Sequence, residues 1–115
     1  MSIELTDAED AKLLALARAQ RARNRVLEAA AVRDTDGRTY TATNVDLPSL
    51  QLTALQAVVS MAVSSGAAGL EAALVVTAAP TVDDTDVAVV RELSGAGIVI
   101  HRASPEGDVL DSVQT

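Results

Sequence analysis

The sequence has no cysteine and a single aromatic residue, Tyr40, among its 115 residues. The absence of cysteine excludes disulfide bonds and metal sites with thiolate ligands. The absence of Phe and Trp means that the core must be built from Ala, Val, Leu and Ile. Because alanine buries little apolar area, a small alanine-rich domain gains only modest hydrophobic stabilisation. We therefore expect a homo-oligomer, in which association buries further surface.

Positive charge is also scarce. The chain has 9 Lys and Arg against 16 Asp and Glu, which gives a net charge of −7 at pH 7. This balance argues against general affinity for nucleic acid or for anionic membranes. The arginines between Arg18 and Arg25 have no aromatic residues among them that could stack on bases, so we interpret them as the solvated end of a helix.

No stretch has the pattern of a signal peptide or of a membrane span. The acidic start, Met1–Glu9, has neither a basic n-region nor an apolar h-region, which favours a cytoplasmic location. Leu47–Leu70 has no charged residue, but polar residues interrupt it. Its densest apolar part, Ala54–Val63, is shorter than the roughly 20 residues that a bilayer span needs. That part predicts a buried core helix.

The patterns along the chain predict one α/β domain over residues 1–115. Thr6 and Glu9 have the spacing of a capping box, which predicts Thr6 as the cap of a helix ending near Arg23. The other predicted helices are about Gln51–Ser64 and Thr85–Leu93, and the predicted strands are Val26–Val32, Arg38–Thr43, Leu70–Thr77 and Ile98–His101. A loop is expected at Asn44–Ser49, and the polar tail from Ser104 is expected to fray.

The order of these elements is helix, hairpin, helix, strand, helix, strand, with the hairpin turn at Asp36-Gly37. Two successive crossovers through helices place parallel strands beside the hairpin. The sequence therefore predicts a mixed sheet that is covered by helices on both faces.

Several segments resemble the small cytidine deaminases that act on free nucleosides. Ala29–Val32, Asp36–Thr41 and Asn44–Asp46 resemble that family's first hairpin and the nucleoside-binding Asn-x-Glu motif that follows it. Ala57–Gly66 resembles the rear half of the catalytic helix, and Arg91–Leu93 resembles the end of the helix with the second zinc motif. Their order and spacing over most of the chain carry the resemblance. It implies a cytidine-deaminase-like α/β/α sandwich and a dimer or tetramer in which helices meet across subunits.

Zinc deaminases hold zinc with three His or Cys ligands and move protons with a nearby Glu. The resemblance places the first ligand position at Thr53 and the catalytic glutamate position at Leu55. It places the paired cysteine positions at Asp83 and Asp86. A neutral Thr is a poor zinc ligand, and Leu cannot transfer a proton. The resemblance therefore implies a pseudoenzyme that has no catalytic residues, no zinc and no cofactor.

Two sets of polar residues allow alternative interpretations. Asp83, Asp84 and Asp86 could ligate Mg²⁺ or Ca²⁺, but a cation site needs more oxygens than this spacing supplies, so an acidic helix N-terminus is favoured. Asn44 and Asp46 could hold a ribose, although Asp is one methylene shorter than Glu. The alternative is that Asn44 only shapes the loop.

Other candidate nucleophiles and bases have simpler explanations. His101 is the only histidine, and the sequence offers it no evident Ser or Asp partner, so a packing or surface role is expected. Thr53, Ser60 and Ser64 on the uncharged helix would each need an activating base. Close helix packing or local hydrogen bonding is the preferred interpretation of these hydroxyls.

The leading hypothesis is a non-catalytic cytidine deaminase homologue that acts through a homo-oligomer or through an unknown protein partner. It predicts no nucleic-acid or membrane partner. The alternatives are a nucleoside-binding sensor, and a deaminase or hydrolase with an altered metal site. Whether Leu55 fills the pocket distinguishes the scaffold from the sensor.

Overall fold

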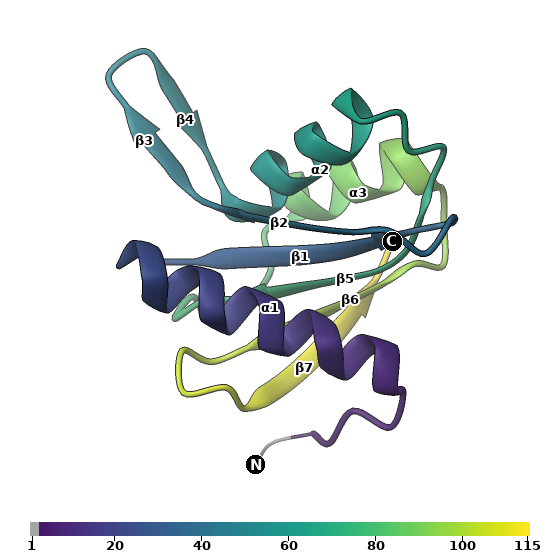
Figure 1. Ribbon diagram of the computed structural model, residues 1–115, viewed down its shortest axis with the longest axis horizontal. Coiled ribbons are helices and arrows are strands. Elements are labelled where there is room, and N and C mark those ends of the chain that lie inside the picture. Colours follow the sequence, from purple (N-terminus) through teal and green to yellow (C-terminus); the bar gives the residue numbers. More distant parts are fainter. Residues whose placement is uncertain (1–2) are drawn as a thin grey trace.

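The computed structural model describes residues 3–115, in which a five-stranded sheet has one helix on one face and two on the other (Figure 1). The helices are α1 (Ala8–Asn24), α2 (Ala54–Ser64) and α3 (Asp84–Ser94). The strands of the sheet are β1 (Ala29–Asp34), β2 (Thr39–Thr43), β5 (Leu70–Val76), β6 (Val99–Ala103) and β7 (Val109–Gln114). Their order across the sheet is β2-β1-β5-β6-β7. The predicted α/β fold, a mixed sheet covered on both faces, is confirmed.

The directions of the strands place the starts of two helices at the same end of the sheet. β1 is antiparallel to both β2 and β5, so β2 and β5 run in the same direction, and β5 pairs in parallel with β6. α2 lies between β2 and β5 in the chain, and α3 lies between β5 and β6. Both helices therefore begin near the carboxyl ends of β2 and β5, where β1 starts.

The sheet separates two apolar clusters because successive residues of a strand point to opposite faces. On one face Leu13 and Ala17 of α1 are buried with Ala29, Ala31 and Leu74. On the other face the buried residues include Ala30, Val32, Leu55, Val58, Val90 and Ile100. β1 is therefore buried on both of its faces. No helix within residues 3–115 is long and apolar enough to cross a membrane.

The helix α1 begins one residue later than the capping box predicted. The cap is Asp7, whose carboxylate accepts a hydrogen bond from the backbone N–H of Glu9 at 2.8 Å. The prediction of Thr6 as the cap is therefore wrong. The helix ends at Asn24, and its C-cap, Arg25, has a φ of 54°. The following strand starts at Ala29 and not at Val26.

The turn between β1 and β2 confirms the hairpin signal at Asp36-Gly37. The buried Asp34 carboxylate accepts hydrogen bonds from the backbone N–H groups of Asp36 and Arg38 and from the Tyr40 hydroxyl, each at 2.9 Å. Burial alone would raise the pKa of Asp34, but these three donors hold that pKa below its ordinary value. The carboxylate therefore fixes the turn in its ionised form.

A second hairpin replaces the loop that was predicted at Asn44–Ser49. It consists of β3 (Val45–Leu47) and β4 (Leu50–Leu52), and Figure 1 shows it projecting away from the sheet. Val45 pairs with Leu52, and Leu47 pairs with Leu50. The loop prediction is wrong because the short segments on both sides of the turn satisfy their backbone groups by pairing with each other.

The tail after Ser104 does not fray but forms the outer strand β7, which pairs antiparallel with β6. A buried arginine explains why this polar segment is ordered. The Nε and Nη2 atoms of Arg102 donate to the two carboxylate oxygens of Asp111 on β7 at 2.9 and 2.8 Å. Its Nη1 donates to the carbonyl oxygen of Ala79, in the loop after β5, at 3.0 Å. Charge-assisted bonds of this kind are stronger than neutral ones.

Candidate functional site

The starts of α2 and α3 enclose a small cavity at the end of the sheet where β5 stops and β1 begins. The cavity measures about 50 Å³, and its lining includes Thr53, Leu55, Asp83 and Asp86. Thr53 and Asp86 are 33 residues apart in sequence, yet their side chains are hydrogen-bonded. The fold therefore brings together the four side chains that the resemblance singled out.

Thr53 is the N-cap of α2, and its hydroxyl is fully engaged. The oxygen accepts from the backbone N–H of Gln56 at 3.1 Å, and the hydroxyl donates to Oδ1 of Asp86 at 2.9 Å. The side chain of Gln56 accepts in return from the backbone N–H of Thr53 at 2.9 Å. This reciprocal pair is a capping box, which stabilises the first turn of the helix. In this structure the Thr53 side chain therefore acts as a helix cap.

Leu55 lies in the first turn of α2 and is 1% exposed. It belongs to the apolar cluster between the sheet and the helices α2 and α3. Its side chain can neither donate nor accept a proton. The cavity lining is therefore apolar at this position, while Asp83 and Asp86 add carboxylates to the same lining.

Glu28 is a further residue of the site that the sequence reasoning missed. Its Oε1 accepts from the backbone N–H of Ala54 at 3.0 Å, so a carboxylate lies at the positive end of the α2 dipole. It lines the cavity together with Asp83 and Asp86. The available signal was a lone acidic residue directly before the apolar run Ala29–Val32.

Asn44 and Asp46 lie beside the cavity, and both have structural partners. Oδ1 of Asn44 accepts from the backbone N–H of Glu28 at 3.1 Å, which ties the end of β2 to the start of β1. Asp46 is exposed on β3 and accepts from the Gln51 side chain at 3.3 Å. Both residues border an open groove of about 280 Å³ that reaches Thr53. The structure thus places them close enough to each other to line one groove.

A larger hollow of about 360 Å³ adjoins this region. It lies between the end of α1, the start of β1 and the segment after β5, and its lining includes Arg21, Glu28, Asn44 and Thr77. Glu28 and Thr77 also line the small cavity. The two spaces are therefore neighbours that share one carboxylate.

The sequence decides the family to which this fold belongs. The family described as cytidine deaminase-like has a sequence model that matches residues 6–107 of this chain. The chain belongs to the cytidine deaminase-like family. The matched range includes every residue that lines the small cavity. It also includes Asn44 and Asp46, which line the neighbouring groove.

Solved cytidine deaminases have the same fold. The enzyme from Burkholderia pseudomallei matches with a TM-score of 0.76 at 23% identity, with 90% of each chain covered. The enzyme from Mycobacterium leprae matches with a TM-score of 0.70 at 22% identity, with 94% of each chain covered. The enzyme from Mycobacterium tuberculosis gives a TM-score of 0.70 at 28% identity over 82% of this chain and 85% of that chain. A comparison with curated proteins gave no match.

The residues around the small cavity do not fit the zinc site of a cytidine deaminase-like enzyme. Such a site takes three His or Cys ligands. The sequence contains no cysteine, and its one histidine, His101, does not line this cavity. Within residues 3–115, no group of three or more His, Cys, Asp or Glu side chains is arranged to hold a metal ion. No zinc-dependent step can therefore be derived from these side chains.

Asp86 is the titratable group that this site perturbs most clearly. Burial raises the pKa of its carboxyl, and the nearby charges of Glu28 and Asp83 raise it further. The hydrogen bond from Thr53 acts in the opposite direction but does not cancel these effects. Because the folded state binds this proton more tightly than the unfolded state, the protonated form stabilises the fold. That contribution is complete below the ordinary pKa of 3.8 and is lost as the pH rises through the raised value.

We expect the substitution Asp86→Asn to stabilise the protein at neutral pH. The asparagine side chain still offers an oxygen to the Thr53 hydroxyl but removes a buried negative charge from beside Glu28. The melting temperature should rise by a few degrees at pH 7, and the gain should shrink as the pH falls through the raised pKa of the wild-type carboxyl.

The matched control is Asp84→Asn in the same helical turn, where the side chain is exposed. This change removes a charge that favours the helix N-terminus and should leave stability unchanged or slightly lower it. An Asp86→Asn protein that melts below the wild type at pH 7 would contradict the account of the Asp86 carboxylate.

Proposed function

We propose that this protein is a member of the cytidine deaminase-like family that is non-catalytic at the deaminase site and acts in the cytoplasm through self-association or a protein partner. The observation that carries the proposal is the cavity at Thr53, Leu55, Asp83 and Asp86, which measures about 50 Å³. Sites for small molecules usually measure roughly 300–1,000 Å³. A nucleoside therefore does not fit into this cavity.

The chemistry of the lining supports the same conclusion. Zinc deaminases need a metal-bound water as nucleophile and a glutamate that moves protons. At the positions that the resemblance assigns to this machinery, the Thr53 hydroxyl caps a helix and Leu55 is packed in the core. The carboxylate of Asp86 accepts from Thr53, and Glu28 accepts from the backbone of α2. The Thr53 hydroxyl and one oxygen each of Asp86 and Glu28 are thus engaged in hydrogen bonds within the fold.

The exposed face of α2 supports self-association. Ser60 and Ser64 lie one turn apart in the middle of this face, and Met61 and Val63 flank them, 45% and 55% exposed. We call these four residues the α2 surface. The helix has no charged residue, so two copies of it can approach without desolvating a charge. The projecting β3–β4 hairpin adds two exposed leucines at its tip, Leu47 and Leu50.

One set of measurements on the purified full chain tests the proposal. After exposure to zinc and dialysis, elemental analysis should find far less than one zinc per chain, and cytidine should not be deaminated above the buffer rate. Light scattering at micromolar concentration should give the mass of a dimer or a larger oligomer. The cytidine deaminase from Mycobacterium tuberculosis serves as the positive control. Stoichiometric zinc with turnover would overturn the non-catalytic assignment, and a monomer would overturn self-association.

A second candidate function is a nucleoside-binding sensor, and the hollow of about 360 Å³ beside Asn44 favours it. This space is within the size range of small-molecule sites, and Asn44, Glu28 and Arg21 offer polar groups to a ligand. Millimolar cytidine or uridine should then raise the melting temperature. An unchanged melting temperature with both nucleosides would remove this candidate.

A further inference from the structure

Ser112, His101 and Asp10 form a hydrogen-bonded chain on the face of the sheet that α1 covers. His101 and Ser112 are paired neighbours on the antiparallel strands β6 and β7. Oγ of Ser112 lies 2.7 Å from Nδ1 of His101, and Nε2 of His101 lies 3.0 Å from Oδ2 of Asp10. No Ser or Asp partner of His101 was evident in the sequence, but the structure supplies both. Its partners lie 11 and 91 residues away in sequence, on the tail strand and on α1.

The carboxylate of Asp10 determines the orientation of this chain. An ionised carboxylate can only accept, so Nε2 of His101 must carry the proton that it shares with Asp10. In the neutral ring, Nδ1 is then unprotonated and accepts from the Ser112 hydroxyl. The hydroxyl proton of Ser112 therefore points at a nitrogen that is able to take it. This is the arrangement in which a histidine activates a serine nucleophile.

Ser112 is more exposed than His101 and Asp10, as a nucleophile that must meet its substrate needs to be. Ser112 is exposed on the outer strand β7, where a reagent can reach it. The side chains of His101 and Asp10 are only 12% and 15% exposed. The base and the carboxylate are therefore largely shielded from water, while the hydroxyl faces the solvent.

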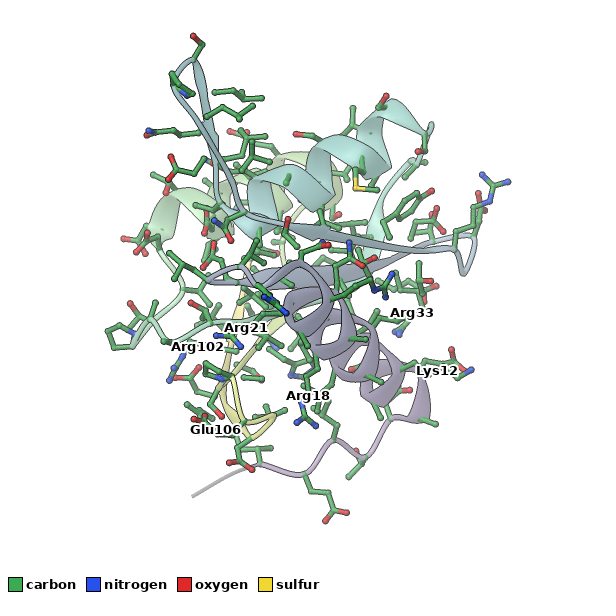
Figure 2. The ribbon with its side chains drawn as sticks, turned by 60° about the vertical axis from the view of Figure 1, so that its left-hand side comes forward. Lys12, Arg18, Arg21, Arg33, Arg102 and Glu106 are labelled. Atoms are coloured by element: carbon green, nitrogen blue, oxygen red, sulfur yellow. The ribbon has the colours of Figure 1, made fainter. Side chains whose placement is uncertain are left out.

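A fourth residue, Arg33, fixes the carboxylate of Asp10. Nη2 of Arg33 lies 3.0 Å from Oδ1, the oxygen of Asp10 that does not face His101. Nε of Arg33 donates to Glu71 on the neighbouring strand at 2.9 Å. Figure 2 shows the Arg33 side chain beside α1, the helix that carries Asp10. Arg33 on β1 and His101 on β6 thus contact the two oxygens of the Asp10 carboxylate, which restricts its orientation.

We propose that Ser112 is a nucleophile with His101 as its general base and Asp10 as a positioning residue, and that it accepts acyl groups from activated carboxylic esters. The class of substrate follows from the open position of Ser112 on an outer strand. A surface site gives little help to the departing group, so the ester must release a stable anion such as a phenolate. This site lies on the α1 face and is separate from the cavity between α2 and α3.

The reaction has two balanced steps. Oγ of Ser112 attacks the carbonyl carbon while its proton passes to Nδ1 of His101. The bond from the carbonyl carbon to the phenolic oxygen then breaks, and the departing phenolate takes that proton from Nδ1 and leaves as the phenol. A water molecule then attacks the acyl group on Ser112, again giving a proton to Nδ1, and that proton returns to Oγ as the carboxylic acid leaves. In sum, one ester and one water give one acid and one phenol.

The test uses the full chain with p-nitrophenyl acetate as the probe. We expect a rapid release of p-nitrophenolate and a mass increase of one acetyl group that peptide mapping places on Ser112. Ser112→Ala should abolish this labelling and the rapid release. His101→Gln should slow the release by at least about 100-fold, the smallest effect typical of losing a general base. Asp10→Asn should slow the release while KM for the ester stays unchanged, which a purely structural role would not produce.

The matched control is Ser49→Ala, which removes an exposed serine from the turn of the β3–β4 hairpin and should change neither labelling nor release. Because Ser112 is exposed, Ser112→Ala should melt at the wild-type temperature, so a loss of labelling cannot be attributed to unfolding. A Ser112→Ala protein that releases p-nitrophenolate as fast as the wild type, or an acetyl group found on Lys12 or His101 in place of Ser112, overturns the proposal. Neither result bears on zinc binding or self-association.

Discussion

Leu55→Glu should destabilise the protein by roughly 3–5 kcal/mol at neutral pH, the usual effect of an unpaired buried charge. Leu55 is 1% exposed, and the introduced carboxylate would lie in a lining that already contains Glu28, Asp83 and Asp86. A loss of this size is a large part of the 5–15 kcal/mol by which domains are usually stable. Urea unfolding followed by circular dichroism measures the change. We therefore expect that a glutamate at position 55 is not accommodated in this cavity unless other residues change too.

Two further variants at the same position separate charge from shape. Leu55→Met keeps the volume and the apolar character and should lose less than about 1.5 kcal/mol. Leu55→Gln has the shape of glutamate without its charge and should fall between the two. Burial and the neighbouring carboxylates raise the folded-state pKa of the introduced glutamate, so its penalty should shrink as the pH falls towards 4. Equal stability of Leu55→Glu and Leu55→Met at pH 7 would show that this lining tolerates another charge.

Ser60→Arg should dissociate the proposed oligomer, raising its dissociation constant by at least about 100-fold. Ser60 lies in the middle of the exposed face of α2 and is itself exposed, so the substitution should not disturb the fold. In a symmetric dimer the same patch meets its own copy, so one substitution brings two guanidinium groups together. Like charges that are brought together at an interface cost several kcal/mol. Light scattering over a dilution series gives the dissociation constant.

A control for the added charge is Ala15→Arg, at an exposed position of α1 on the opposite face of the sheet. This variant changes the net charge by the same amount and should keep the wild-type mass at every concentration. If both variants dissociate to the same extent, the effect is due to net charge, and the α2 surface is not the interface.

The main elements could be predicted because their signals are local. The uncharged run around Ala54–Val63 predicted α2, and Asp36-Gly37 predicted the turn that the structure shows. The apolar run at Leu70–Thr77 predicted β5, which is buried between β1 and β6. The periodicity of apolar residues is enough for elements of this kind, since one face or both faces must be buried.

The missed elements depend on partners that are distant in sequence. β7 looked like a polar tail because half of its residues are polar, and its order depends on pairing with β6 and on the bond between Arg102 and Asp111. The β3–β4 hairpin depends on two three-residue strands that are too short for a periodic pattern to be visible. Edge strands and short hairpins satisfy backbone groups more than they bury side chains, so hydrophobicity alone does not reveal them.

The residues of the candidate site also divide into those that the sequence could place and those that depend on partners distant in sequence. The resemblance to cytidine deaminases placed Thr53, Leu55, Asp83 and Asp86 in one group, and the structure gathers them around one cavity. Glu28 was missed because it approaches from the start of β1, and no spacing rule connects it with α2. The partners of His101 were missed for the same reason, since Asp10 is 91 residues away. Contacts between elements require the fold itself.

The guanidinium of Arg102 links two parts of the molecule. It holds the outermost strand by Asp111 and, at the same time, the carbonyl of Ala79, which borders both the small cavity and the larger hollow. β7 is the outermost strand on its side of the sheet, and Val109 at its start bridges to Ile3. Without β7, Arg102 would lose its carboxylate partner and keep only the carbonyl of Ala79, so one side chain couples the order of the outer strand to the position of the segment after β5.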